Sequence, residues 1–404
     1  MGSPTVVLHC NAGSAYGMGH LMRSLALAEE ANGRGWSVAL VGDLDTSALR
    51  LARGFLPGLE VITRPREELN HWFSDILEVR KPDVLHLDTY WDVPDYLSDQ
   101  GWVLSNMQDD AFGLRPAHLA IDANLGAENR FTATGLSTHQ LLGVSAAVVR
   151  QQVRRQREHD SYLSEPIRVL IVLGGTDPHG LTARVVEQMD VITSSALLTV
   201  VCGEGQAEAV QAAARKIQHP VSMHRFLTDL PAEARGHTLV ISAAGTSVWD
   251  FACMGVPMAL VCAVDNQLAG YQAATAEGLA VPLGIPPYLD LRDRLRALDA
   301  LLRDARGLKT QSARLREAVD GLGAWRIVRT WESLVEAGST GGVIMRSPSG
   351  VNAVCESTRR KSSRRQLRMK LPNTAGEQHA LIGAGYLPYL PAAASGHEIW
   401  AKWT

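Results

Sequence analysis

Two glycines and a histidine follow the first apolar run of the chain. The run Thr5–Cys10 is rich in apolar and β-branched residues, and Gly17, Gly19 and His20 come after it, where the pattern predicts that a helix begins. Glycine lets a backbone approach a ligand closely, and the N–H groups at a helix N-terminus attract an anion. An imidazole there can accept a proton near neutral pH. We therefore expect an anion site with His20 as its base. The alternative is a dinucleotide-binding turn with an incidental histidine, although the third glycine of that fingerprint is missing.

A second glycine turn follows the apolar run Ile167–Leu173. Gly174, Thr176 and Asp177 stand between this run and the next expected helix. Small and hydroxyl-bearing residues at such a place can contact a phosphate of a nucleotide. The same pattern fits a plain turn in which Thr176 or Asp177 caps the helix. This turn is a candidate for nucleotide contact, and by itself not a specific one.

The longest run of candidate residues follows the expected strand Thr238–Ser242. Gly245, Thr246 and Ser247 leave room for a diphosphate against backbone amides, and the two hydroxyls add donors. Asp250 comes one helical turn later, where it can reach a ribose hydroxyl, as an acidic residue does in dinucleotide sites. Capping of the helix by Thr246 is the alternative, but it does not account for the whole run. We expect a nucleotide diphosphate to bind here.

The segment Asp43-Leu44-Asp45 follows the expected strand Ser37–Gly42. Two carboxylates at this spacing can hold a divalent cation. An acidic residue directly before Thr46 and Ser47 more commonly caps a helix. Helix N-termini and hydroxyls can themselves stabilise a leaving diphosphate. We therefore expect chemistry without a metal and without a cofactor.

From residue 5 to about 337, short apolar runs alternate with longer amphipathic stretches, which predicts βαβ units and parallel sheets. The first half has expected strands at Thr5–Cys10, Ser37–Gly42, Asp83–Asp88, Trp102–Asn106 and Leu119–Asp122, and a helix at His20–Arg34. Residues 151–165 are polar and are expected to form a partly helical linker. The second half has expected strands at Ile167–Leu173, Leu197–Cys202, Ser222–Arg225, Thr238–Ser242 and Met258–Cys262, and helices at Thr246–Met254, Leu291–Asp304 and Thr310–Arg329. We expect the last of these helices to pack back across both halves. The predicted fold class is α/β: two Rossmann-like domains, 1–150 and 166–338, that face each other, and an irregular tail, 339–404.

The tail differs in charge from the rest of the chain. It carries nine Lys and Arg against three Asp and Glu, whereas the whole chain has a formal net charge of −3. Because the tail offers little apolar area to bury, we expect it to be disordered or loosely packed. The overall charge argues against a nucleic-acid partner.

Apolar runs and cysteines bear on the compartment. No run approaches the ~20 residues of a membrane span, and no basic start precedes an apolar stretch, so we expect neither a span nor a signal peptide. The five cysteines form no Cys-x-x-Cys pair, which is typical of reduced thiols and favours a cytoplasmic protein. The oligomeric state does not follow from the sequence.

Several segments occur in an order that resembles a known family: GMGHLMRSLALAEE, LDTY, IDAN, VLGGTDP, ISAAGTSVWDFACMGVP, DNQ and DGLGAWRIV. Over residues 5–337 the chain resembles the UDP-sugar hydrolases of pseudaminic acid synthesis, and equally the related spore-coat-polysaccharide glycosyltransferase-like proteins. The resemblance implies the two-domain glycosyltransferase-B fold with His20 as catalytic base. It further implies a sugar site with Tyr90 and Asn266, and nucleotide contacts from Gly174, Thr176, Asp177, Gly245, Thr246, Ser247 and Asp250. We also predict substrate contacts from Gly17, Gly19, Arg23 and Gln267.

The hypothesis that follows is a metal-independent inverting glycosyltransferase. His20 would deprotonate a hydroxyl of a small-molecule or glycan acceptor, which attacks the anomeric carbon of a UDP- or dTDP-sugar. In the alternative, a nucleotide-sugar hydrolase, water replaces the acceptor. The chain has Gly143-Val144-Ser145-Ala146-Ala147 where the family usually shows Gly-Pro-x-Tyr-Ala, and this departure favours transfer. A non-catalytic nucleotide-sugar binder and an NAD-dependent oxidoreductase are further alternatives, the latter without a complete fingerprint in this chain.

Overall fold

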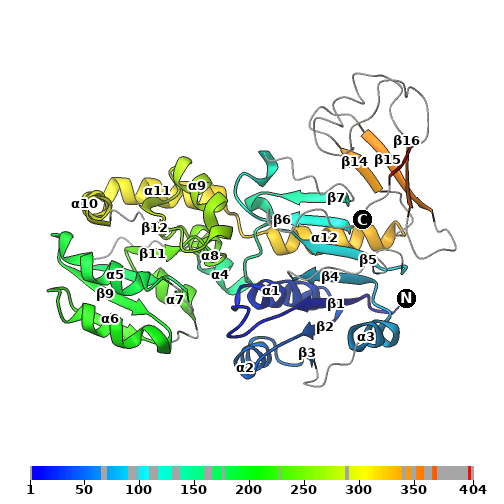
Figure 1. Ribbon diagram of the computed structural model, residues 1–404, viewed down its shortest axis with the longest axis horizontal. Coiled ribbons are helices and arrows are strands. Elements are labelled where there is room, and N and C mark those ends of the chain that lie inside the picture. The colour runs from blue at the N-terminus through cyan, green and yellow to red at the C-terminus, as the bar shows by residue number, and fades with distance from the viewer. Residues whose placement is uncertain are drawn as a thin grey trace.

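The computed structural model of the chain describes residues 2–64, 71–89, 97, 100–108, 117–129, 137–158, 166–174, 177, 179–225, 227, 229–286, 291–338, 343–346, 352–358, 366–370 and 399–401. These residues form two α/β lobes that lie side by side, and a small third sheet (Figure 1). The predicted fold class, two facing Rossmann-like domains, is confirmed.

The first lobe is built on a seven-stranded sheet in the order β3-β2-β1-β4-β5-β6-β7. All of its paired strands run parallel. The strands are β1 (Thr5–Cys10), β2 (Ser37–Gly42), β3 (Glu60–Thr63), β4 (Val84–Asp88), β5 (Val103–Met107), β6 (Ala117–Asp122) and β7 (Ser137–Leu142). The helices that pack on this sheet are α1 (Gly19–Gly33), α2 (Thr46–Phe55), α3 (Trp72–Arg80) and, from the end of the second half, α12 (Gly323–Glu336).

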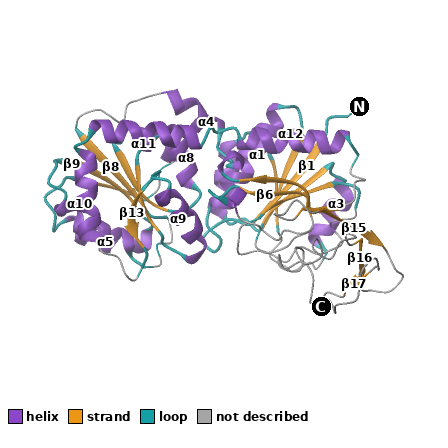
Figure 2. Cartoon of the chain, turned by 90° about the horizontal axis from the view of Figure 1, so that it is seen from above, coloured by secondary structure: helices purple, strands orange, loops and turns teal. Residues whose placement is uncertain are grey.

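The central strand β1 shows why helices cover both faces of this sheet. Val6 and Leu8 lie in one apolar cluster with residues of α1 and α12, while Val7 lies in another with Leu77 of α3. Successive residues of a strand point to opposite faces, so a strand that is apolar throughout needs cover on both. Figure 2 shows the strands of each lobe between helices.

The second lobe repeats this plan on a six-stranded parallel sheet, β10-β9-β8-β11-β12-β13. The strands are β8 (Ile167–Val172), β9 (Ala196–Val201), β10 (Val221–His224), β11 (Leu239–Ala243), β12 (Met258–Val261) and β13 (Val281–Gly284). The helices are α5 (Leu181–Gln188), α6 (Ala207–Ala214), α7 (Leu230–Arg235), α8 (Ser247–Met254), α9 (Leu268–Ala276), α10 (Leu291–Leu302) and α11 (Ala305–Ala318). Between the lobes, the expected linker begins with α4 (Gln151–Arg155).

Helix α12 returns from the second lobe to the first. Ile327, Val328 and Trp331 are fully buried in the apolar cluster that also holds α1. Trp331 Nε1 donates a hydrogen bond to Ser105 Oγ on β5 at 3.0 Å. The segment expected to form one helix across both halves contacts both lobes as two helices: Leu315 of α11 lies in an apolar cluster with second-lobe residues, and α12 packs on the first lobe. Although α12 falls inside the predicted second domain, 166–338, its core contacts are with the first lobe.

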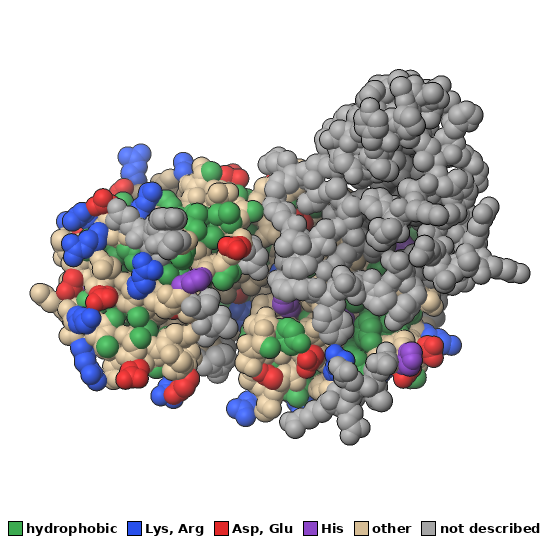
Figure 3. All heavy atoms as spheres, in the orientation of Figure 1, with side chains coloured by type: hydrophobic (Ala, Val, Ile, Leu, Met, Phe, Trp, Pro, Cys, Tyr) green, Lys and Arg blue, Asp and Glu red, His purple; other side chains and the backbone are tan. Residues whose placement is uncertain are grey.

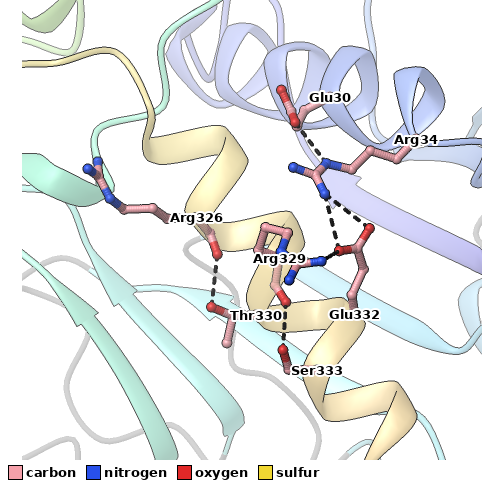
Figure 4. Close-up of polar contacts among 7 residues, drawn as sticks. All are labelled: Glu30, Arg34, Arg326, Arg329, Thr330, Glu332 and Ser333. Carbon is pink, nitrogen blue, oxygen red and sulfur yellow. Dashed lines mark hydrogen bonds and ion pairs between the residues drawn. The ribbon is translucent and has the colours of Figure 1, made fainter.

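An ion-pair network fastens the same helix to α1 (Figure 4). Arg34 near the end of α1 donates to Glu30 Oε1 at 2.8 Å and to both carboxylate oxygens of Glu332 at 3.1 and 3.2 Å. Arg329 reaches the same Glu332 carboxylate at 2.8 Å. These contacts fix α12 against the first lobe on its polar side, as the buried residues do on its apolar side.

The single helix expected at Thr310–Arg329 is wrong, because the chain breaks between α11 and α12. Gly321 has a positive φ of 77°, and a Cβ there would lie 2.7 Å from Cys253 Sγ. A Cβ on Gly323 would collide with the backbone of Ala147. The two glycines let the chain turn where it lies against both lobes.

In the predicted tail, 339–404, the described residues form four short strands: β14 (Val343–Arg346), β15 (Asn352–Thr358), β16 (Gln366–Lys370) and β17 (Ile399–Ala401). They pair antiparallel in chain order. None of the helices in the described part of the chain is long and apolar enough to cross a membrane. On the face drawn in Figure 3, basic and acidic side chains are interspersed along the outer edge of the second lobe, which gives that edge mixed charge.

Candidate active site

Helices α1 and α8 lie near the junction of the two lobes (Figure 1), and their N-termini are close together. A Cβ added to Gly19, the first residue of α1, would lie 3.2 Å from Thr246 Oγ1 at the start of α8, so these two corners are in contact. The residues at the N-cap positions of the two helices, Met18 and Thr246, make no side-chain capping hydrogen bond. The positive ends of two helix dipoles are thus directed at one small region, which is the arrangement that binds a phosphate anion.

His20 lies in the first turn of α1 with its ring against β4. Its Nδ1 atom is 2.7 Å from Asp88 Oδ1, and the two residues are 8% and 2% exposed. Because a carboxylate oxygen can only accept, Nδ1 carries the proton in this pair. The lone pair of the ring then resides on Nε2, as a general base requires.

Arg23, one helical turn after His20, binds the same carboxylate with two hydrogen bonds. Its Nε donates to Asp88 Oδ2 at 2.9 Å and its Nη2 to Oδ1 at 2.7 Å. Nη2 also lies 3.0 Å from His20 Nδ1, because both donors share Oδ1. Burial alone would raise the pKa of Asp88, but the Arg23 guanidinium and the hydrogen bond with His20 outweigh it and hold this pKa well below its usual range. Asp88 therefore stays ionised and fixes the orientation of the His20 ring.

The topology of the first sheet explains this constellation. Strand β4 pairs with β1, and Asp88 is opposite Cys10 in the parallel register. The carboxyl ends of parallel strands lie at one edge of a sheet, and ligands bind there beside the strand at which the order reverses. Asp88, at the end of β4, is thereby brought to α1, which begins after β1.

Hydrogen-bond donors surround the N-terminus of α8. Thr246 is exposed, and its side chain makes no capping hydrogen bond, so the capping alternative for this residue is wrong. Gln267 Oε1 accepts from the Ala263 amide at 2.9 Å. This bond directs the Gln267 Nε2 group toward the loop, where a Cβ on Gly245 would lie 3.6 Å from it. Thr246, Ser247 and Gln267 thus offer side-chain donors beside the backbone amides of α8.

Asp250 pairs with an arginine of the other lobe. Arg150 Nη2, directly before α4, lies 3.0 Å from Asp250 Oδ2, and both side chains are largely buried. Burial raises the pKa of Asp250, and the Arg150 guanidinium partly offsets this rise. The predicted ribose contact would have to share this carboxylate with Arg150. In the structure Asp250 joins α8 to the junction between the lobes.

The Asp177 side chain binds the N-terminus of helix α5. Its two carboxylate oxygens accept from the Leu181 and Thr182 amides, both at 2.8 Å. Asp177 is 5% exposed and has a φ of 31°, in the left-handed region. The capping alternative for this turn is thus confirmed for Asp177. Gly174, with a φ of 96° at the end of β8, has no neighbour within 4 Å of an added Cβ among the described residues.

The two aspartates that follow β2 are bound to the protein itself. Asp45 Oδ1 accepts from the Ser47 and Ala48 amides and caps α2. Tyr16 Oη donates to Asp43 Oδ2 at 3.2 Å. The capping that the sequence favoured for this segment is confirmed.

The structure does not describe the side chains of three residues that were predicted to belong to the site. Tyr90 and Thr176 lie outside the described residues, and Asn266 is described only as part of the 3-10 turn Asp265–Gln267. Gly17 has a φ of 78° and no described atom within 4 Å of an added Cβ. The positive φ at position 17 favours glycine there.

Two residues of the site were missed by the sequence reasoning. Asp88 was noted as the last residue of a strand and within the segment LDTY, and Arg150 as the arginine that follows Gly143–Ala147, but neither was given a role in the site. The signal for Asp88 was present, because an acidic residue that ends an apolar strand lies at the edge where ligands bind. Nothing local to Arg150 indicates that it pairs with residue 250.

Comparisons with known proteins agree with this architecture. Residues 169–281 match the model of the glycosyltransferase family 28 C-terminal domain. The spore coat polysaccharide biosynthesis protein SpsG of Bacillus subtilis (strain 168) is 20% identical over 341 residues, which span 82% of this chain and 98% of that protein. The resemblance to the spore-coat proteins thus has support over most of the chain, while the resemblance to the hydrolases stays a prediction.

Solved structures with the same arrangement include MurG and a glycosyltransferase. The crystal structure of MurG from Acinetobacter baumannii matches with a TM-score of 0.58 at 16% identity, covering 82% of this chain and 99% of that one. Glycosyltransferase VinC, solved in complex with dTDP, matches with a TM-score of 0.53 at 16% identity, covering 83% and 100%. At these identities the likeness establishes the fold alone. The chain has the two-domain glycosyltransferase-B fold, and its second lobe matches the glycosyltransferase family 28 C-terminal domain.

Proposed function

We propose that the protein is a metal-independent inverting glycosyltransferase that moves a sugar from a UDP- or dTDP-sugar to a hydroxyl group of a small molecule or glycan. The observation that carries the proposal is the contact between two uncapped helix N-termini, one of which bears a carboxylate-bound histidine. The second-lobe match to a glycosyltransferase family and the dTDP bound by VinC support a nucleotide-sugar donor.

His20 is the general base in this proposal. The acceptor oxygen gives its proton to His20 Nε2 and forms a bond to the anomeric carbon, while the bond from that carbon to the diphosphate breaks. Asp88 holds the Nδ1–H tautomer and stabilises the imidazolium that forms, the role that a buried carboxylate plays in other acid–base pairs. Arg23 is then a positioning residue that keeps Asp88 ionised, although it was predicted to contact substrate.

The leaving diphosphate gains negative charge as the bond breaks. The amides at the starts of α1 and α8, the hydroxyls of Thr246 and Ser247 and the Gln267 amide would stabilise this charge. The carboxylates of Asp43 and Asp45 already accept hydrogen bonds from Tyr16, Ser14 and the start of α2. We therefore assign the stabilisation of the diphosphate charge to the donors at α1, α8 and Gln267. Tyr90, Asn266, Gly174 and Thr176 stay predictions for the sugar and nucleotide contacts.

Release of UDP or dTDP from a panel of nucleotide sugars, with and without candidate hydroxyl acceptors, tests the proposal. We expect His20→Ala to lower kcat by about 10²-fold to 10⁴-fold, as loss of a general base typically does. His71→Ala is the control, because His71 is exposed and its side chain does not cap α3. His20→Ala turnover within about tenfold of wild type would exclude the base assignment.

Product analysis separates transfer from hydrolysis. A transferase yields a glycosylated acceptor, whereas free sugar released at full rate without acceptor would identify the hydrolase. Calorimetric titration with UDP, dTDP and NADH distinguishes both from the oxidoreductase alternative. Binding of NADH without binding of a nucleoside diphosphate would overturn the proposal.

A further inference from the structure

The loop that leads from β1 to His20 is a closed hairpin. In this β1–α1 loop, residues 11–18, the Gly13 amide donates to the Gly17 carbonyl at 3.1 Å, and the Gly17 amide donates to the Gly13 carbonyl at 2.8 Å. Gly17 is followed by Met18, whose carbonyl accepts from the Met22 amide at 3.0 Å in the first turn of α1. The hairpin is thus directly continuous with the helix start that bears His20.

The segment Asp43-Leu44-Asp45, which we call the brace, binds this loop along its length. The Ala12 amide donates to the Asp43 carbonyl at 3.0 Å, and the Asp45 amide donates to the Ala12 carbonyl at 3.2 Å. At the base of the loop, Asn11 Oδ1 accepts from the Asp43 amide at 2.9 Å. The backbones of the brace and the loop therefore run together like two short strands.

Asp45 has two separate tasks, one for each carboxylate oxygen. Oδ1 caps α2, and Oδ2 accepts from the Ser14 amide at 2.9 Å. The hydrogen bonds from the Ser47 side chain and from the backbone amides of Ala48, Ser14 and Ser47 outweigh a small effect of burial and lower the pKa of Asp45 to about 2. The carboxylate is therefore ionised at any physiological pH and ties the loop to a rigid helix.

Two further contacts fix the tip of the loop. Asp43 Oδ2 accepts from the hydroxyl of Tyr16, a residue that is 46% exposed. Gly13 packs so closely on Asp45 that an added Cβ would collide with the carboxyl group, and its φ of 137° also favours glycine. The acidic pair of the brace thus contacts both sides of the hairpin.

We propose that the brace is a positioning device for the reaction, and that Asp45 and Asp43 hold the β1–α1 loop so that the α1 N-terminus and His20 are pre-organised for the donor. This proposal rests on the function proposed above. It gives a role to the Asp-x-Asp pattern other than metal binding or capping alone. A group held within a small tolerance can matter greatly for rate, because a misplacement of ~1 Å can cost about 10²-fold.

Asp45→Asn separates the two tasks of Asp45. The carbonyl oxygen of Asn can still cap α2, since Asn is a preferred N-cap, but its NH₂ group cannot accept from the Ser14 amide. Ser47→Ala is the matched control, because it removes the Ser47 side-chain bond to Asp45 and leaves the Ser14 bond in place. Tyr16→Phe is a second variant that removes only the hydroxyl bond to Asp43.

The first measurement is amide hydrogen exchange, which does not depend on activity. We expect exchange in residues 11–21 to become faster by about tenfold or more in Asp45→Asn, as loss of a local hydrogen-bonded unit does, with a smaller change in Tyr16→Phe and none in Ser47→Ala. Wild-type exchange in this segment for both Asp45→Asn and Tyr16→Phe would overturn the proposal.

The second measurement is steady-state kinetics on a donor that wild type turns over. We expect Asp45→Asn to lower kcat by about 10-fold to 100-fold while the donor KM stays within about threefold, and Ser47→Ala to change neither. Equal kcat in Asp45→Asn and Ser47→Ala would overturn the positioning role. If wild type turned over no nucleotide sugar, the proposed function would fail, and the exchange result alone would decide whether the brace orders the loop.

Discussion

The first strand-to-helix corners of the two lobes occupy the same place in two matching sheets. The order β3-β2-β1-β4-β5-β6 in the first lobe corresponds strand by strand to β10-β9-β8-β11-β12-β13 in the second. The corners β1–α1 and β8–α5 therefore both lie where the order of strands reverses, the usual place for ligands in such sheets. The two corners nevertheless carry different groups.

At the β8–α5 corner a carboxylate of the protein, that of Asp177, occupies the start of the helix. The Asp177 carboxylate accepts from two amides of α5, so that helix start is already neutralised and hydrogen-bonded. At the β1–α1 corner the N-cap residue Met18 makes no side-chain capping bond, and Gly19 and His20 begin the helix. The second lobe presents its uncapped helix one strand further on, at β11–α8, where Thr246 meets Gly19.

The difference teaches that topology offers several equivalent helix starts and that local side chains decide which are open to a ligand. A carboxylate at a helix N-terminus stabilises the helix and repels a phosphate from the same amides. The proposed site is accordingly asymmetric, with the base from the first corner of one lobe and the diphosphate cradle from the β11–α8 corner of the other.

The largest effect on kcat is expected from Asp88→Asn, which tests the role of the His20–Asp88 pair at the β1–α1 corner. The Asn amide group would donate to His20 Nδ1 and stabilise the opposite tautomer, with the proton on Nε2, so the base would lose its lone pair at the reacting position. We expect kcat to fall by about 10²-fold or more, with nucleoside diphosphate affinity within about threefold of wild type. Calorimetry and turnover of one variant measure both quantities, and an unchanged kcat would refute the pairing of His20 with Asp88 as part of the mechanism.

A smaller effect is expected from Thr246→Asp, which gives α8 the kind of carboxylate that α5 already has. The new side chain should cap α8 and raise thermal stability slightly, by about 0.5–1 kcal/mol. It should also repel the diphosphate and weaken UDP or dTDP binding by about tenfold or more. Thr246→Ser is the control, because it keeps a neutral hydroxyl. Equal nucleotide affinity in the two variants would show that the diphosphate binds away from α8.

The strands that could be predicted are buried strands whose residues form a continuous apolar run in the sequence. The predicted bounds of β1 and β2 agree with the structure residue for residue. The edge strand β3 and the strands β7 and β13 were missed: β7 begins Ser-Thr-His-Gln, and β13 is four residues long and contains Pro282. Such strands owe their conformation to pairing with neighbours, which a local pattern does not contain.

The residues of the candidate site likewise fall into those that a local pattern predicts and those that it does not. The glycines before His20 and the run 245–247 are local patterns, and the structure brings these two stretches into contact. The partner of His20 is 68 residues away and the partner of Asp250 is 100 residues away in sequence. Their pairing depends on which strand lies beside which and on how the lobes meet, so it could not be derived from spacing. For Asp177 the sequence left two roles open, and the structure shows that its carboxylate accepts from amides of α5.

The smallest effect on binding is expected from Asp177→Asn, the isosteric counterpart of Asp88→Asn in the other lobe. Asn tolerates the left-handed backbone of this position but offers one acceptor oxygen where Asp177 uses two, so one α5 amide loses its partner. We expect the free energy of unfolding to fall by about 1–2 kcal/mol in denaturant titration. Because the α5 start is already filled by the protein, UDP or dTDP affinity and kcat should stay within about twofold, which calorimetry and turnover at a temperature well below unfolding can measure. A loss of nucleotide affinity larger than this would mean that the β8–α5 corner also holds a phosphate. The two first corners would then differ only in degree, and the predicted nucleotide contacts of Gly174 and Thr176 would gain support.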